Sequence, residues 1–344
     1  MAGLKNKTKL AYLLNIACVV VLYLVLNMLI HNGVINRYYS DIITMACINV
    51  ILAVSLNLVT GLLGQLVLGH AGFMLVGGYA AALFTKMSGI PLGIAFPIGL
   101  LIAGLVAAFF GLVIGVPALR LRGDYLAIIT LGFGEIIRVI ANNLSITNGA
   151  KGLSGIQSLN TREFPTIMFT YVFFVAALVI FIMFTFGRSR HGRAVIAIRE
   201  DEIAAEASGI HTTYYKLLAF ILAAFIAGVA GGLYSHQIGI IDPAKFDFNR
   251  SVEILVMVVL GGMGSITGSI LAAIVLTFLP EVLRMLPGDL ANYRMLLYSV
   301  VLIIVMLFRP TGLLGRSEFS AVNLVEKLKG KLTTSKPSAG KKEA

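Results

Sequence analysis

The sequence predicts an all-α polytopic membrane protein with about ten transmembrane helices, some of them short or broken. Composition is the first reason, since 58% of the 344 residues are hydrophobic and only 12% are charged, far from the balance of a soluble domain. The second reason is that the hydrophobic residues form long runs separated by short polar segments. A helix needs about 20 apolar residues to cross a bilayer core about 30 Å thick, so each run of that length predicts one crossing.

The first crossing is predicted at residues 10–30, an apolar run without a charged residue. The lysines before it resemble the start of a signal peptide, but the run is too long and no Ala-x-Ala cleavage site follows, so we expect a retained anchor. By the same length rule, further crossings are predicted at 42–60, 65–84, 94–119, 125–141, 168–186, 217–234, 251–263, 266–285 and 293–308. The shortest, 125–141 and 251–263, are expected to be tilted or broken helices with a functional role.

Three regions follow from this pattern: a cytoplasmic end with its anchor helix at 1–40, a core of apolar crossings at 41–316 and a basic cytoplasmic tail at 317–344. An even number of crossings places both termini on one side, and the basic residues between crossings lie on that side, which the positive-inside rule makes the cytoplasm. The net charge of +11 does not predict nucleic-acid binding, because the basic residues lie at helix ends and in the tail.

The sequence contains no motif of a membrane enzyme. It lacks the G-x-x-x-x-G-K-[ST] phosphate loop, the H-E-x-x-H zinc motif and a G-x-S-x-G elbow between a strand and a helix. Cys18 and Cys47 both fall inside predicted crossings, so they predict neither a disulfide nor a metal site. We therefore expect no catalytic residue, metal or cofactor, which leaves a channel, a secondary transporter or the membrane subunit of an ATP-driven transporter.

The polar segment 187–216 bears on these alternatives because it is charge-dense and lies between two apolar runs. Glu200, Asp201 and Glu202 are expected to begin a short helix, where the exposed backbone N–H groups favour negative charge. Gly209 is a natural C-terminal stop for that helix.

Ile203 and Ala207 are four residues apart in this short helix, so they would form one small apolar face together with Ala204. Such a face permits close approach to a groove on another protein. It also suits a solvated helix that only joins two crossings, and the pattern alone favours neither interpretation.

Segment 192–209 resembles the cytoplasmic coupling loop of ABC importer permeases, specifically branched-chain amino-acid permeases of the LivM type. Other segments resemble the same family in the same order and cover most of residues 41–315. They are 61–73 (GLLGQLVLGHAGF), 119–138 (LRLRGDYLAIITLGFGEIIR), 257–269 (MVVLGGMGSITGS), 279–284 (LPEVLR) and 308–315 (FRPTGLLG).

The resemblance implies an ABC importer permease fold in the bacterial inner membrane, working by alternating access to import leucine, isoleucine and valine. It implies as partners a second homologous permease subunit, two cytoplasmic ATPase subunits that use ATP-Mg, and a periplasmic substrate-binding protein. Urea and amide permeases resemble the same family, so the substrate stays open. The residues implied in ATPase coupling are Gly192, Arg193, Arg199, Glu200, Asp201, Ile203, Ala204, Ala205, Ala207 and Gly209.

Two charged residues are predicted inside one crossing. Glu135 would lie about 15 Å deep at the helical rise of 1.5 Å per residue, where a lone carboxylate is costly. Arg138 follows three positions later and can pair with it on the same helix face. We prefer an internal ion pair that fixes helix packing over a pair that lines or gates a translocation path.

The remaining candidates for the path lie in two glycine-rich segments, 61–72 and 261–268, which occupy comparable places in the two halves and suggest an internal repeat. In the first, Gln65 could cap backbone groups or contact a substrate, and His70 is expected to bond an unpaired carbonyl. In the second, helix ends could meet and offer N–H groups to a carboxylate. We favour the other interpretation, in which the glycines serve dense packing of helices. The candidate residues of this second segment are Gly261, Gly262, Gly264 and Ser265.

Two alternatives depend on charged residues elsewhere. His70 and Glu135 keep a proton-coupled secondary carrier open, but such a carrier has no need of segment 187–216. Arg250 and Glu253 are expected near the outer end of a crossing, as solvated charges or as contacts for a binding protein.

Overall fold

The computed structural model describes residues 2–121, 123–160, 166–284, 294–309, 311–315 and 318. In this part of the chain the regular secondary structure is helical except for one short antiparallel pair of strands, which confirms the predicted all-α class. The α-helices are α1 (Ala2–His31), α2 (Arg37–Asn57), α3 (His70–Met87), α4 (Leu92–Ala118), α5 (Asp124–Asn143), α6 (Ile167–Arg188), α7 (Arg190–Glu200), α8 (Glu202–Ala207), α9 (Thr212–Ile238), α10 (Phe248–Gly261), α11 (Ile266–Arg284) and α12 (Arg294–Phe308). The remaining elements are the π-helix η1 (Leu58–Leu62), the 3₁₀-helices η2 (Gly149–Lys151) and η3 (Pro243–Lys245), and the strands β1 (Leu153–Ser154) and β2 (Ile240–Ile241).

Within the described residues, five helical segments are long and apolar enough to cross a membrane: 37–62, 92–118, 167–188, 212–238 and 266–284. Two shorter apolar segments lie in α1 and α12, at 17–31 and 296–305. The structure thus supports a multi-pass membrane protein, while the count of about ten crossings stays a prediction.

Several boundaries differ from those predicted. The crossing predicted at 65–84 begins only at His70, because the chain from Gly64 to Gly69 is not helical. Gly64 has a φ of +77°, which ends the preceding helix, and a side chain at Gly69 would overlap the carbonyl of Thr130 on α5. α5 is 20 residues long and so longer than expected, whereas α10, with 14 residues, is short as predicted.

The centre of the bundle is formed by α3, α4 and α9, whose backbones approach closely at glycines. Gly77 and Gly78 of α3 face Gly228 and Gly231 of α9, and a Cβ at Gly231 would overlap the carbonyl of Met74. Helices in lipid associate by this kind of close contact, because apolar side chains gain little by leaving an equally apolar solvent. α2 packs beside this centre, against α6, α9 and α11.

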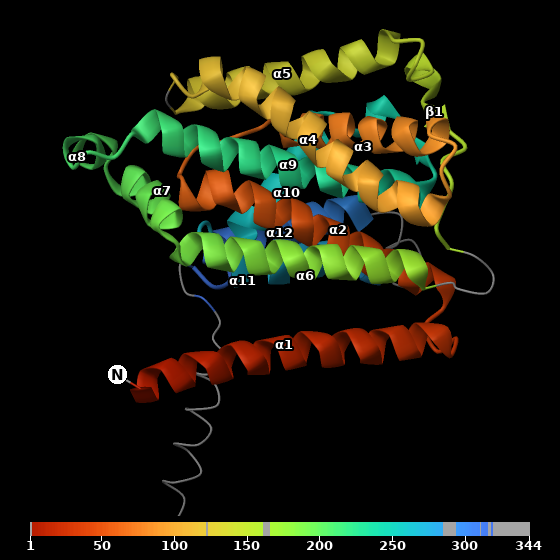
Figure 1. Ribbon diagram of the computed structural model, residues 1–344, viewed down its shortest axis with the longest axis horizontal. Helices are drawn as coiled ribbons and strands as arrows, with labels where there is room; N and C mark the ends of the chain where they lie inside the picture. The colour runs from red at the N-terminus through yellow and green to blue at the C-terminus, as the bar shows by residue number, and fades with distance from the viewer. Residues whose placement is uncertain are drawn as a thin grey trace, which may run out of the picture.

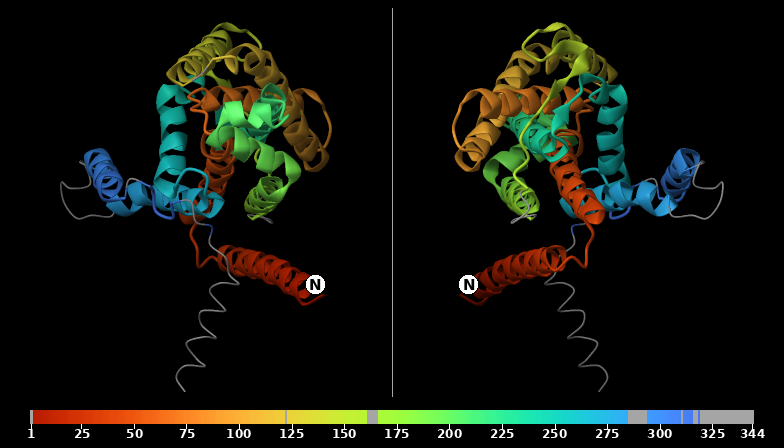
Figure 2. Two further views of the ribbon diagram at one scale, coloured as in Figure 1. Left: turned by 90° about the vertical axis from the view of Figure 1, so that its left-hand side faces the viewer. Right: turned by 90° about the vertical axis from the view of Figure 1, so that its right-hand side faces the viewer.

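The two ends of the bundle differ (Figure 1). α7 and α8 lie at one end together with the start of α1, and β1 lies at the opposite end. Figure 2 shows that α1 is set apart from the other helices. It contacts α6 through Tyr23, whose hydroxyl lies 3.1 Å from that of Thr170. We refer below to the end with α7 and α8 as the loop end and to the other as the strand end.

The close contact of α3 and α9 predicts a large effect of a single methyl group. Gly231→Ala should destabilise the protein by about 1–3 kcal/mol, because the added Cβ forces the two backbones apart. The control is Gly132→Ala on α5, where no atom lies within 4 Å of the added Cβ and alanine favours the helix. Thermal unfolding of the detergent-solubilised protein measures both variants, and equal melting temperatures would contradict this account of the core.

Candidate functional site

Segment 187–216 forms two short helices that are both capped from within. The Ser189 side chain accepts the N–H of Gly192 at 3.1 Å and begins α7. Asp201 begins α8, since its Oδ1 accepts the N–H groups of Ile203 at 2.9 Å and Ala204 at 3.0 Å. The predicted short helix is confirmed with Asp201 as its cap, but Glu200 ends α7 instead of beginning α8.

The predicted apolar face of α8 is exposed at the loop end of the molecule (Figure 1). Ile203 is 73% exposed, and Ala204 and Ala207 are exposed beside it. Ala205 differs from its expected place, because it is only 5% exposed and packs toward the rest of the chain. Ala205 therefore supports α8 from beneath and does not offer a surface to a partner.

α8 is attached to the bundle at its start and is ended by a glycine. At its start, Glu202 Oε1 lies 2.7 Å from Lys216 Nζ on α9, and the Lys216 side chain is only 4% exposed. After its last residue, Gly209 has a φ of +83° and ends the helix as predicted. The exposed face is thus carried on a firmly attached helix.

The two arginines of α7 have different positions. Arg193 is exposed and donates to the carbonyl of Arg188 at 2.9 Å. Arg199 points into the molecule, where its Nη1 donates to the carbonyl of Gly61. Its side chain also fills the space that a Cβ at Gly64 or Gly264 would occupy, so it lies between the two glycine-rich segments.

The glycine-rich segments meet around a buried amide, Asn57, which the sequence analysis did not single out. Asn57 is 1% exposed, its Oδ1 accepts the N–H of Gly264 at 2.9 Å, and its Nδ2 donates to the carbonyl of Ser265 at 3.0 Å. A side chain at Gly61 would overlap both Asn57 and the Gly264 nitrogen. The signal in the sequence was an amide inside the apolar run 42–60, one turn before Gly61.

The second glycine-rich segment is closely packed, as preferred from the sequence. A Cβ at Gly261 would overlap the backbone of Gly268, and one at Gly262 would overlap the carbonyl of Gly315. The Ser265 hydroxyl accepts the N–H of Gly268 at 3.1 Å.

The free N–H groups expected at this segment are occupied by the chain itself. Glu318 accepts the N–H of Ile266 at 2.6 Å and that of Thr267 at 3.1 Å. Nearby, a carbonyl at the end of α10 is also satisfied by the chain, since Leu260 accepts the N–H of Leu313 at 2.8 Å. A carboxylate is bound at the start of α11 as the pattern allowed, but it belongs to residue 318 and not to a ligand.

His70 and Gln65 lie in the first glycine-rich segment in unlike surroundings. His70 is 2% exposed, and its ring has two partners on α2: its Nε2 lies 2.8 Å from the hydroxyl of Ser55, and the backbone of Leu52 supplies the expected carbonyl bond. Gln65 lies in the non-helical stretch before α3, and its Oε1 is buried without a hydrogen-bond partner in the described part of the chain.

The predicted pair of Glu135 and Arg138 is confirmed as an ion pair. Arg138 Nε lies 2.8 Å from Glu135 Oε2, and the side chains are 26% and 32% exposed. Glu135 lies beside the start of α10, where Asp247 and Ser251 line the same small cleft. A role in gating stays a prediction.

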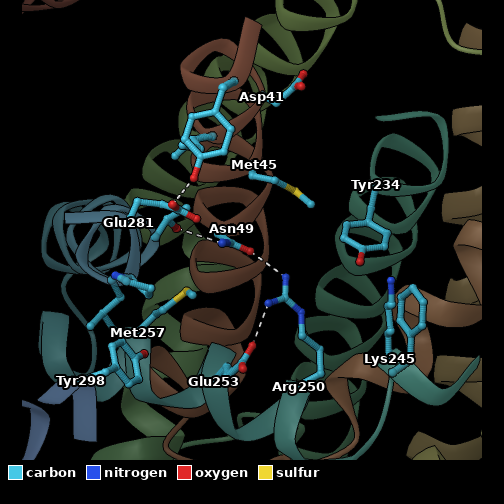
Figure 3. Close-up of a pocket in the computed structure, with 16 residues that line it drawn as sticks. Asp41, Met45, Asn49, Tyr234, Lys245, Arg250, Glu253, Met257, Glu281 and Tyr298 are labelled. Atoms are coloured by element: carbon cyan, nitrogen blue, oxygen red, sulfur yellow. Dashed lines mark hydrogen bonds and ion pairs between the residues drawn. The ribbon is translucent and has the colours of Figure 1, made fainter. Parts of the chain in front are cut away.

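A cavity of about 500 Å³ lies among α2, α9, α10, α11 and α12, and the sequence analysis did not predict it (Figure 3). It contains polar, charged, aromatic and aliphatic side chains. They are Tyr38, Asp41, Ile42, Met45, Asn49, Tyr234, Lys245, Phe246, Arg250, Glu253, Met257, Leu276, Thr277, Pro280, Glu281 and Tyr298.

Arg250 lies inside this cavity, which corrects its expected place among solvated outer charges. Its side chain is 17% exposed, and its two terminal nitrogens donate to Asn49 at 2.7 Å and to Glu253 at 2.9 Å. Asn49 in turn donates to Thr277 at 2.9 Å. The signal that could have found it was again an amide within the apolar run 42–60.

Comparison with known proteins identifies a family of membrane permeases. Residues 38–306 match the family model described as branched-chain amino acid transport system / permease component. The chain is 40% identical over 308 residues to the high-affinity branched-chain amino acid transport system permease protein LivM of Salmonella typhimurium, and equally to that of Escherichia coli, covering 81% of this chain and 71% of the relative. It is 27% identical over 297 residues to Escherichia coli LivH, covering 81% of this chain and 95% of LivH. No solved structure matches it significantly.

The bridge at Asn57 predicts a specific loss of stability. Asn57→Ala leaves the part-buried N–H of Gly264 without its partner, at a cost of about 1–3 kcal/mol, while the carbonyl of Ser265 keeps the bonds that it accepts from Ser269. Asn143→Ala is the matched control, since Asn143 is an exposed amide whose side chain donates to the carbonyl of Val139 on its own helix. Thermal unfolding and proteolysis of the solubilised protein compare the two. Unfolding of both variants at the same temperature would refute the bridge.

Proposed function

This chain belongs to the family of branched-chain amino acid transport system permease components, and we propose that it is the membrane-spanning subunit of an ATP-driven importer of leucine, isoleucine and valine. The observation that carries this proposal is the 40% identity over 308 residues to proteins named as LivM permeases. In this proposal the chain lies in the bacterial inner membrane with about ten crossings and with the loop end and both termini in the cytoplasm.

A second homologous permease is part of this proposal. Escherichia coli has two relatives of this chain, LivM and LivH, and both are named as permease proteins of a high-affinity branched-chain amino acid transport system. Two different permeases named for the same kind of system support a pair of unlike membrane subunits. Two ATPase subunits and a periplasmic substrate-binding protein complete the assembly, and ATP-Mg binds to the ATPase subunits.

The ATPase subunits are proposed to dock on the exposed face of α8. Ile203 is the largest apolar side chain of that face, and the alanines beside it allow a groove to approach closely. Arg193 and Glu200 lie on neighbouring α7 and add charge to the same end. The segment can transmit work only if it binds the ATPase with different affinity in the two states of the transporter.

Arg199 is proposed to transmit movement of α7 to the membrane helices. Its bond to Gly61 and its contact with Gly64 and Gly264 connect α7 to both glycine-rich segments. Through Asn57 these segments are also connected to each other. A shift of α7 would therefore act on α2 and on the junction of α10 and α11 together, which is what alternating access requires.

The substrate and the docking face are tested by uptake in cells that lack this gene. The wild-type chain should restore uptake of labelled leucine, and Ile203→Glu should reduce it at least about tenfold, because a charge on the docking face must be desolvated. Ile203→Leu keeps the face apolar and serves as the control, with the amount of each variant in the membrane measured by immunoblot.

The same experiment separates the alternatives. Restored uptake of labelled urea without leucine would assign the chain to urea and amide transport. Uptake by Ile203→Glu at the wild-type rate, stopped by a proton ionophore and not by ATP depletion, would replace the ATP-driven importer with a proton-coupled carrier.

The role of Arg199 is tested in the purified transporter complex. Arg199→Ala should lower leucine uptake about tenfold while most ATP hydrolysis remains, because the ATPases still dock on α8 but lose their connection to Gly61. Arg190→Ala removes an exposed arginine at the start of the same helix and is the control. If uptake per ATP hydrolysed is the same in both variants, Arg199 has no part in transmission.

A further inference from the structure

We propose that the cavity at Arg250 is a binding site for the transported substrate and that it takes an α-amino acid as its zwitterion, with the substrate carboxylate on Arg250. This inference rests on the proposed function, which supplies an amino acid as the cargo, and goes beyond it by naming the site and the groups that recognise the cargo. The cavity volume of about 500 Å³ lies in the usual range of small-molecule sites.

The cavity has the position that an entry site needs. One of its walls is α2, from Tyr38 at the start of the helix to Asn49. At a rise of 1.5 Å per residue, these two residues are separated by about 16 Å along the helix axis. The far end of α2 leads into η1, where Gly61 meets Arg199. The cavity therefore lies in the half of the bundle away from α7 and α8.

Arg250 is suited to hold a carboxylate. A charged side chain among apolar helices is costly, and such residues are retained where they serve a substrate or ion path. Asn49 and Glu253 each accept one N–H from a different terminal nitrogen of the guanidinium, which fixes its plane in the cavity (Figure 3). Each terminal nitrogen carries two N–H groups, so the second of each is available for a planar carboxylate.

The ammonium group of the substrate has its partner on the same helix. Glu253 is one turn from Arg250, lies in the cavity wall and is 53% exposed on its side chain. An ammonium placed beside it would be attracted to a carboxylate while the substrate carboxylate stays on Arg250. The pair thus offers one charge of each sign on neighbouring turns of α10, as the two charged groups of an amino acid require.

The remaining wall supplies an apolar pocket for the substrate side chain. Met257 and Leu276 are buried, at 4% and 3% exposed, and Ile42 lies beside them in the lining, with Met45 partly buried. Methionine side chains adapt to branched aliphatic groups of different shape. A site of this kind accepts leucine, isoleucine and valine and rejects urea, because urea has neither the charges nor the apolar body that the walls require.

Protection of an introduced cysteine tests the site. In a Cys18→Ser, Cys47→Ser background, Met45→Cys places a thiol in the cavity wall, and Ile146→Cys places a control thiol on an exposed loop outside the lining. Membrane vesicles that contain the complete transporter are treated with a small charged thiol reagent. We expect leucine, isoleucine and valine to slow labelling at Met45→Cys and not at Ile146→Cys.

The ligand series and the arginine variant make the test specific. Leucinol is leucine without the carboxylate, 3-methylbutanoate is valine without the ammonium group, and neither they nor urea should protect. Arg250→Lys keeps the charge but loses the planar fork, so about tenfold more leucine should be needed for the same protection.

Each of the other possible outcomes of this experiment contradicts a different part of the proposal. If wild-type vesicles import leucine but leucine does not protect Met45→Cys, the cavity is not the substrate site. Equal protection by leucinol or 3-methylbutanoate, or unchanged protection in Arg250→Lys, contradicts recognition of a zwitterion by Arg250. If wild-type vesicles import no leucine at all, the proposed function fails first.

Discussion

The fold depends on how backbone groups are satisfied where its helices are broken. Within a bilayer no water replaces a lost helical hydrogen bond, so interrupted helices persist only where protein groups take over. In this chain the interruptions at Gly61 and Gly264 meet, and Asn57 bonds both the N–H of Gly264 and the carbonyl of Ser265. Glu318 accepts the N–H of Ile266 at the start of α11, and Arg199 donates to the carbonyl of Gly61. These backbone groups of the junction are thus satisfied by side chains of the chain itself.

α2 connects this junction to the cavity at the other half of the bundle. Two buried amides on one helix have corresponding roles, since Asn57 bridges the broken segments and Asn49 orients Arg250. A displacement of α2 would move both at once, which gives a physical route between the loop end and the cavity. Such a route requires two discrete arrangements of the junction, and a change between them would have to break the bonds that Asn57 and Arg199 make to its backbone.

The glycines of the central helices and those of the junction affect the backbone in different ways. Between α3 and α9 they bring two regular helices into backbone contact, and this gives a dense centre with little freedom. At the junction they accompany positive φ angles, at Gly64, Gly262 and Gly264. The molecule therefore combines a core of α3, α4 and α9 in close backbone contact with a junction whose glycines adopt backbone conformations that other residues rarely take.

The sequence by itself determined the features that arise from neighbouring residues. Apolar run length predicted the all-helical class, and three-residue spacing predicted the Glu135–Arg138 pair. The acidic run at 200–202 and Gly209 predicted a short helix between them, although Glu200 belongs to the end of α7. These depend on hydrogen bonds and side-chain contacts within a few residues, so local pattern suffices.

Only the tertiary structure decided which way the polar side chains of the core point. Arg199 turns inward to Gly61, 138 positions away in the chain, and Arg250 reaches Asn49 across 201 positions. Ala205 is buried and Ile203 exposed, although both are apolar residues of one short helix. A buried polar group needs a hydrogen-bond partner, and the packing of the other helices decides which group it finds. That packing depends on the whole bundle, so local periodicity in the sequence does not predict it.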